Sequence, residues 1–139
     1  VKDLFDMPVL IVKKGNGVRH QIDEIALAAI LKILIGDLSP IYFAVERQQS
    51  MPGQGVSSTF GFGMSYGIMR GMLAVLGAAT DYVHPRRWKS VMMDGMAKDK
   101  DASRIRAKEL FGTAVDLSLR KHHGRADALL ICEWRRRQG

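Results

Sequence analysis

The sequence has 139 residues, of which 47% are hydrophobic and 25% charged, as expected for one ordinary globular domain with a single core. Lys and Arg outnumber Asp and Glu by 21 to 14, giving a formal net charge of +7. This balance favours a polyanionic partner, nucleic acid first and an anionic membrane surface second, although a basic surface without any such partner gives the same count. The single cysteine, Cys132, excludes an internal disulfide and argues against a structural zinc site.

No secretory signal is visible, and a reducing, cytoplasmic compartment fits the cysteine content best. The most apolar stretch, residues 59–79, contains five glycines and carries Arg70 near its middle. A central Arg costs about 2.5–3.5 kcal/mol on insertion scales. We therefore expect a soluble helix there and no membrane partner.

The first half of the chain predicts a strand, a helix and a second strand. β-branched residues after Pro8 indicate a strand that the turn at residues 15–17 ends, and residues 21–37 indicate a helix with Gly36 as its stop signal. Five consecutive apolar residues at 41–45 are typical of a short strand buried on both faces. This order predicts a parallel crossover and the α/β class. The expected apolar side of the helix is Ile22, Ala26, Ala29, Ile30 and Ile33.

A polar loop follows at 47–59, and Ser57 or Ser58 is expected to cap the next helix. That helix carries Gly63, Gly67 and Gly71 four residues apart, a ridge without side chains. Such a ridge allows another backbone to approach closely, either in the core of the same chain or in a twin subunit.

The second half predicts a strand over 80–85, a helical turn around Trp88, a mobile charged loop, and a helix over 102–112. A last helix is expected to open at Arg125. Asp127 then lies in its first turn and in line with Leu130, Ile131 and Trp134, which should face the core.

Two acidic residues are the main candidates for chemistry. Glu46 ends the buried strand, and sites in open α/β sheets lie beyond the carboxyl ends of the strands. Asp127 lies on the apolar side of its helix, where an ionised carboxylate needs a partner. A divalent cation shared by Glu46 and Asp127 would supply that partner. The simpler alternatives are a carboxylate where a strand reaches water and an acid that favours a helix N-terminus.

His122 and His123 precede Asp127 by five and four residues. An imidazole there could bind a metal, accept a proton from water or contact phosphate, whereas the alternative is an exposed basic turn. Basic residues that should border this edge contact phosphates without reading sequence. They are Arg86, Arg87, Lys89, Lys98, Lys100, Arg104, Arg106, Lys108, Arg120, Lys121 and Arg125.

Several segments together resemble the RuvC-like Holliday junction resolvases, particularly the compact bacteriophage type. They are "FAVERQQSMPGQGVSSTFGFGMSYG", "VHPRRWKSVM", "KDKDASRIRAKELF" and "HHGRADALLICEW", and they cover most of the chain from Ile41 onward. The resemblance implies one RNase H-like nuclease domain over residues 1–139, with a mixed central sheet flanked by helices. It also implies a metal-dependent endonuclease that cuts four-way DNA junctions as a homodimer.

Carried over residue by residue, the resemblance makes Glu46 and Asp127 the family's acids and His123 the nearest match to a third catalytic position. It implies that the loop after Glu46, with Arg47, Gln48 and Gln49, engages the junction. The basic stretch expected to face DNA contains Lys89, Lys98, Lys100 and Arg104, and Lys121 and Arg125 are added from the basic residues near Asp127.

One family feature is absent from the sequence. The family begins with a strand bearing an Asp in an Ile-Asp-x-Gly-type motif, and Asp6 in "LFDMP" is a poor substitute for it. We therefore expect an N-terminal hairpin of about two strands to be missing, and weak or no catalysis by the sequence as it stands.

The leading hypothesis is a structure-selective DNA endonuclease that uses two Mg²⁺ ions, or Mn²⁺ in their place, at Glu46, Asp127 and His123. The competing hypothesis is a non-catalytic DNA-binding or scaffold protein that retains the fold. A third is an RNA-cutting or transposase-like relative with the same site.

Overall fold

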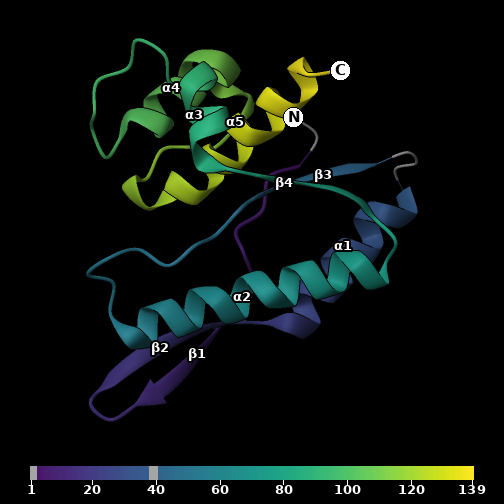
Figure 1. The fold of residues 1–139 in the computed structure, drawn as a ribbon, viewed down its shortest axis with the longest axis vertical. Helices are drawn as coiled ribbons and strands as arrows, with labels where there is room; N and C mark the ends of the chain where they lie inside the picture. The colour runs from purple at the N-terminus through teal and green to yellow at the C-terminus, as the bar shows by residue number, and fades with distance from the viewer. Residues whose placement is uncertain (1–2, 38–40) are drawn as a thin grey trace. The chain divides into compact units, whose positions relative to one another are not determined.

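The computed structural model describes residues 3–37 and 41–139 (Figure 1). Contacts divide the chain into two compact units. The hairpin unit comprises Met7–Phe43 and Gln48–Thr80, and the C-terminal unit comprises Val1–Asp6, Ala44–Arg47 and Asp81–Gly139. None of the helices in 3–37 and 41–139 is long and apolar enough to cross a membrane.

The hairpin unit begins with two antiparallel strands, β1 (Val9–Lys14) and β2 (Gly17–Ile22). β1 starts directly after Pro8, as predicted. Lys14 pairs with Gly17, so the turn consists of two residues, and its first residue, Gly15, has a φ of +57°. Glycine adopts this conformation without strain and is favoured in such turns. β2 was not predicted, because the turn at residues 15–17 was interpreted as the end of a strand rather than as the centre of a hairpin.

Helix α1 (Glu24–Asp37) begins after Asp23, whose Oδ1 accepts a hydrogen bond of 2.9 Å from the backbone N–H of Ala26. Its predicted apolar side is wrong. Leu27 and Leu31 are the buried residues, whereas Ile33 is 63% exposed and Ile22 belongs to β2. The helix is apolar around most of its circumference, so its cap and the preceding strand set which side is buried.

Helix α2 (Val56–Val75) begins before both serines that were expected to cap it. Its N-cap is Gly55, without a side-chain cap, so the expected cap by Ser57 or Ser58 is wrong. The glycine ridge is exposed, and no atom lies within 4 Å of the position that a Cβ would take at any of its three glycines. Within the described residues no second backbone packs against this ridge, so its interpretation as core packing is also wrong.

Strands β3 (Tyr42–Glu46) and β4 (Ala79–Val83) form the second two-stranded sheet. The backbone N–H of Arg47 donates to the carbonyl of Val83 at 2.8 Å, which places the carboxyl ends of both strands side by side, as in a parallel pair. The parallel crossover therefore runs through α2. The predicted crossover from the first strand to β3 is wrong, because β1 pairs with β2. β3 is half-buried and Tyr42 is 64% exposed, so the predicted burial on both faces is wrong as well.

The C-terminal unit consists mainly of helices α3 (Pro85–Met92), α4 (Ala102–Phe111) and α5 (His123–Arg137), with short 3₁₀ turns at Gly112–Ala114 and Arg120–His122. Both α3 and α4 pack on α5 (Figure 1). Gly112, with a φ of +57°, follows α4 as predicted. Pro85 was expected to end the preceding strand, but it opens α3 instead, a position that favours proline. The largest fully buried side chains of the unit are Trp88, Met92, Leu117 and Leu130.

Candidate metal and DNA site

Glu46 ends β3, as predicted, and its carboxylate is held in place. Oε2 of Glu46 accepts a hydrogen bond of 2.8 Å from the indole Nε1 of Trp88. Trp88 is fully buried in the core of the C-terminal unit. A carboxylate that only marked the end of a strand would not need such an anchor, because water would satisfy it.

Asp127 lies in α5, whose first turn contains no acidic residue because the helix begins at His123 rather than Arg125. The predicted first-turn position is therefore wrong, and a favourable helix-dipole interaction does not explain this acid. The predicted side is right, since Leu130, Ile131 and Trp134 are all buried. Oδ1 of Asp127 is itself buried and has no hydrogen-bond partner among residues 3–37 and 41–139. Such an atom carries a desolvation cost that a donor or a cation would offset.

The two carboxylates belong to the same compact unit. Glu46 is bonded to Trp88, and Trp88 shares its hydrophobic core with Ala126 and Leu130, which flank Asp127 along α5. One carboxylate is thus anchored through one oxygen, and the other has a buried oxygen without a donor. Carboxylate oxygens are the ligands that a hard divalent cation prefers. Within 3–37 and 41–139, no group of three His, Cys, Asp or Glu side chains suitable for a metal is present.

The two histidines have different surroundings. His122 is 3% exposed, and its Nδ1 accepts a hydrogen bond of 3.4 Å from the backbone N–H of Leu119, so it stabilises the turn before α5. His123 is half-buried at the first position of α5, four residues before Asp127 and therefore on the same side of the helix. His123 is the better placed of the two to act beside Asp127.

Arg104, a predicted DNA contact, is engaged within the protein. Its guanidinium forms an ion pair with Asp101 and donates to the carbonyl of Leu117 at 3.0 Å. This hydrogen-bonded guanidinium holds the pKa of Asp101 below its usual value, with smaller contributions from the charges of His123 and Arg120. A DNA contact by Arg104 would have to compete with these bonds.

Arg125 is engaged in a similar way. Its guanidinium donates to both oxygens of Asp6, at 2.7 and 2.8 Å, and lies 3.4 Å from Oδ2 of Asp116. These contacts tie the start of α5 to the N-terminal segment and to the loop before α5. The hydrogen bonds from Arg125 also lower the pKa of Asp6.

The other predicted DNA contacts are more accessible. The ammonium of Lys89 lies 5.1 Å from the centroid of the Trp88 ring, directly beside the anchor of Glu46. Lys98 and Lys100 are exposed in the loop between α3 and α4, and Arg47 and Lys121 are also exposed. These lysines are free to move towards a phosphate backbone.

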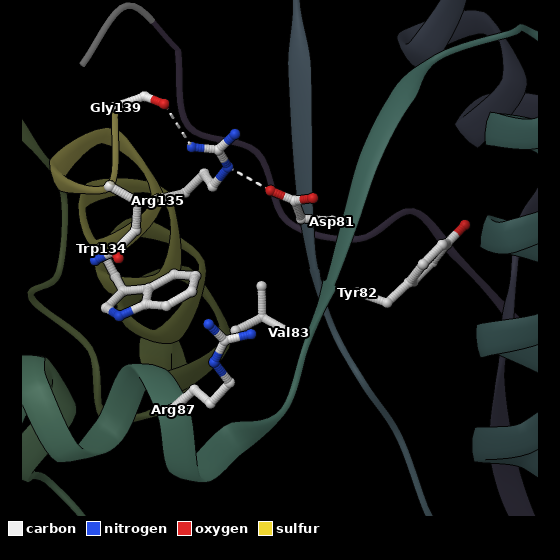
Figure 2. A pocket seen from close by; sticks show the side chains of 8 residues that line it. Asp81, Tyr82, Val83, Arg87, Trp134, Arg135 and Gly139 are labelled. Carbon is white, nitrogen blue, oxygen red and sulfur yellow. Dashed lines mark hydrogen bonds and ion pairs between the residues drawn. The ribbon is translucent and has the colours of Figure 1, made fainter.

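Gln48 and Gln49 belong to the hairpin unit, where they line a pocket of about 170 Å³ with Phe62 and Tyr66 of α2. A larger pocket, of about 390 Å³, lies in the C-terminal unit between the end of α5 and β4 (Figure 2). There Arg135 pairs with Asp81 and donates to the carbonyl of Gly139 at 3.4 Å. The lining of this larger pocket includes neither Glu46, His123 nor Asp127.

Sequence reasoning missed Trp88 as the partner of Glu46 and the internal role of Arg104. The pair of Arg104 with Asp101 follows helical i, i+3 spacing and could have been found. Trp88 stands 42 residues from Glu46, so only the general need of a buried indole N–H for an acceptor pointed to such a bond.

Two known proteins are similar to this chain, one in sequence and one in fold. The chain is 33% identical, over an alignment of 148 residues, to the chloroplastic Holliday junction resolvase MOC1 of Chlamydomonas reinhardtii. The alignment covers 94% of this chain, which spans only 17% of the length of that relative. The RuvC structure of Thermus thermophilus superposes with a TM-score of 0.57 at 18% identity, over 94% of this chain and 87% of that one. No family model matches.

The α/β class and the RNase H-like fold expected from the sequence are therefore confirmed, although the described strands form two small sheets instead of one central sheet. The chain has the fold of RuvC and is related in sequence to a Holliday junction resolvase, so the predicted resemblance to RuvC-like resolvases is confirmed.

Proposed function

We propose that the protein is a metal-dependent, structure-selective DNA endonuclease that acts on four-way junctions or related branched DNA. The observation that carries this proposal is the buried, unpartnered oxygen of Asp127 in the same compact unit as the anchored carboxylate of Glu46. The sequence relative named as a Holliday junction resolvase supports the choice of substrate.

Glu46 and Asp127 would hold Mg²⁺, with Mn²⁺ as a substitute, and a pair of ions is the arrangement we favour. Bound there, the cation would supply Lewis acidity at the scissile phosphate. His123 would accept a proton from the attacking water, whose oxygen joins the phosphorus while the bond to the 3′ oxygen breaks. Lys89, Lys98, Lys100 and Lys121 would contact phosphates and hold the branch in place.

A homodimer fits this proposal, because two symmetric nicks in a four-way junction require two symmetric sites. Such a dimer would deliver one Asp127 and one Glu46 to each of two opposite strands. We also propose that the protein is cytoplasmic and has no membrane partner. The relative differs in this respect, since its name describes it as chloroplastic.

Cleavage of a labelled four-way junction by the full-length protein tests the proposal. We expect nicking that requires Mg²⁺ or Mn²⁺ and spares linear duplex of the same sequence. Asp127→Asn should reduce the rate at least about 100-fold, since it removes a ligand charge at the reacting phosphate. The matched control is Glu133→Gln, which removes the same charge from the other end of α5.

Intact junction at every protein concentration, or equal cleavage by Asp127→Asn and the wild type, would contradict the nuclease proposal. Metal-independent, salt-sensitive binding without cleavage would then favour the non-catalytic DNA-binding or scaffold protein. Cleavage of RNA hybrids in preference to branched DNA would favour the RNA-cutting relative.

A further inference from the structure

We propose that Trp88 is a positioning residue for Glu46, and that its indole N–H holds one carboxylate oxygen so that the other remains available to a divalent cation. This inference rests on the proposed function, because Glu46 acts as a metal ligand only there. It adds a residue that neither the motifs nor the comparisons assign to the site.

The geometry gives Trp88 a rigid position. Its side chain is fully buried and shares a core with Val83, Met92 and Leu130, so the ring cannot change its rotamer without disturbing its neighbours. Its Nε1 lies 2.8 Å from Oε2 of Glu46, within the range of a good hydrogen bond. The carboxylate at the end of β3 is thereby attached to the hydrophobic core of the unit.

The chemistry of the donor supports the same role. An indole N–H is neutral, so it orients the carboxylate without neutralising the negative charge that a cation requires. Other carboxylates of the C-terminal unit are treated differently, since Asp101 is paired with Arg104 and Asp6 with Arg125. No ion pair of Glu46 with Lys or Arg occurs in the described part of the chain. Lys89 contacts the face of the Trp88 ring instead.

Residues that hydrogen-bond to a metal-ligating side chain commonly affect metal affinity. Hydrogen bonds that orient a ligating carboxylate hold it in the binding geometry, and their removal typically costs about 10–100-fold in metal affinity or activity. A carboxylate with two oxygens can accept the indole hydrogen bond and bind a cation at the same time. Trp88 therefore acts on the cation only through Glu46.

The first test uses the indole N–H signals in a ¹H–¹⁵N NMR spectrum of the protein. The chain has two tryptophans, and Trp134, whose ring faces the guanidinium of Arg87 at 5.6 Å, is the internal control. Addition of Mg²⁺ should shift the Trp88 signal and leave that of Trp134 in place. Glu46→Gln should move the Trp88 signal without metal and abolish its response to Mg²⁺.

The second test compares Trp88→Phe with Trp134→Phe, two variants that remove the same indole N–H from buried rings of one core. Mn²⁺ binding followed by electron paramagnetic resonance should weaken about 10-fold in Trp88→Phe and by less than twofold in Trp134→Phe. The Mg²⁺ concentration for half-maximal junction cleavage should rise in parallel. If Trp88→Phe does not fold, the response of the Trp88 signal to Glu46→Gln decides.

Either of two results overturns the inference, even if the wild type cuts junctions. One is a Trp88 signal that does not move in Glu46→Gln, and the other is equal Mn²⁺ affinity of folded Trp88→Phe and the wild type. Failure of the proposed function looks different. In that case the wild type leaves junctions intact while the Trp88 signal still reports the change at Glu46.

Discussion

The carboxylate of Asp127 carries a desolvation cost in the free protein, because its Oδ1 is buried without a donor among the described residues, and the proposed site makes use of the same oxygen. We expect Asp127→Asn to raise the free energy of unfolding by about 1 kcal/mol in EDTA, since a neutral amide is less costly to bury than an unpartnered carboxylate oxygen. Thermal unfolding in EDTA measures this. With Mg²⁺ the wild type should gain stability and Asp127→Asn should not. A variant less stable than the wild type in EDTA would contradict the argument.

At the residue scale the sequence identified where Glu46 and Asp127 lie, but not what surrounds them. The end of an apolar strand and the register of an apolar helix stripe were sufficient to place both acids, since these depend on local periodicity. The bond from Trp88 to Glu46 depends on the tertiary fold, and local patterns carry no information about it. The ion pair of Arg104 with Asp101 was missed for a different reason. The basic residues of this segment were all assumed to lie on a DNA-binding surface.

At the scale of elements, the end of α5 is stabilised by an acid that faces two arginines. Glu133 accepts hydrogen bonds from Arg136 and Arg137, three and four residues later, and these lower its pKa to about 2. The folded-state pKa lies below the ordinary value of 4.5, so the stabilisation is present above pH 4.5 and is lost as the pH falls towards 2.

Glu133→Gln should therefore lower the free energy of unfolding by about 0.5–1 kcal/mol at pH 7, the range of solvent-screened helical pairs. Urea unfolding at several pH values measures the difference from the wild type, which should shrink between pH 4.5 and 2. A difference that stays constant over this interval would exclude the pair as its source.

Arg104 joins the start of α4 to the loop before α5 through Asp101 and the carbonyls of Leu117 and Ser118. Arg104→Ala should lower Tm by several degrees, and Arg104→Lys should recover little, because a single ammonium cannot reproduce the planar fork of donors. Lys108→Ala on the exposed side of the same helix is the matched control. Thermal denaturation followed by circular dichroism compares the three variants, and full recovery by Arg104→Lys would show that charge alone matters.

The elements themselves were predicted unevenly, and the reason is the ambiguity of particular segments. Helices α4 and α5 were found because Gly112 marks the end of the first and apolar residues recur at helical spacing in the second. β2 was missed although Val18, His20 and Ile22 follow the Gly15 turn at every second position. This spacing is typical of the second strand of a hairpin. In α1 apolar residues occupy every side, and only the tertiary fold selects Leu27 and Leu31 as its buried face.

At the scale of the whole molecule, the RuvC fold was inferred from motifs spread over the chain rather than from composition. The strand at 42–46 and the three C-terminal helices lie within or overlap the segments that carry those motifs. Charge is the other property of the whole molecule, and a net +7 does not by itself say which face meets a polyanion. We expect the loop between α3 and α4 to contact the DNA phosphates, because Lys98 and Lys100 are exposed there.

Replacing both Lys98 and Lys100 by Ala should flatten the dependence of junction affinity on salt. Each phosphate contact contributes about 0.9 to the slope of log affinity against log salt on duplex DNA, so the double variant should lose roughly 2. Binding of a four-way junction in EDTA at several salt concentrations measures the slope without cleavage. The matched control is Lys13→Ala with Lys14→Ala, which removes the same charge from β1. If both double variants flatten the slope equally, attraction comes from the total charge and the loop between α3 and α4 is not the contact surface.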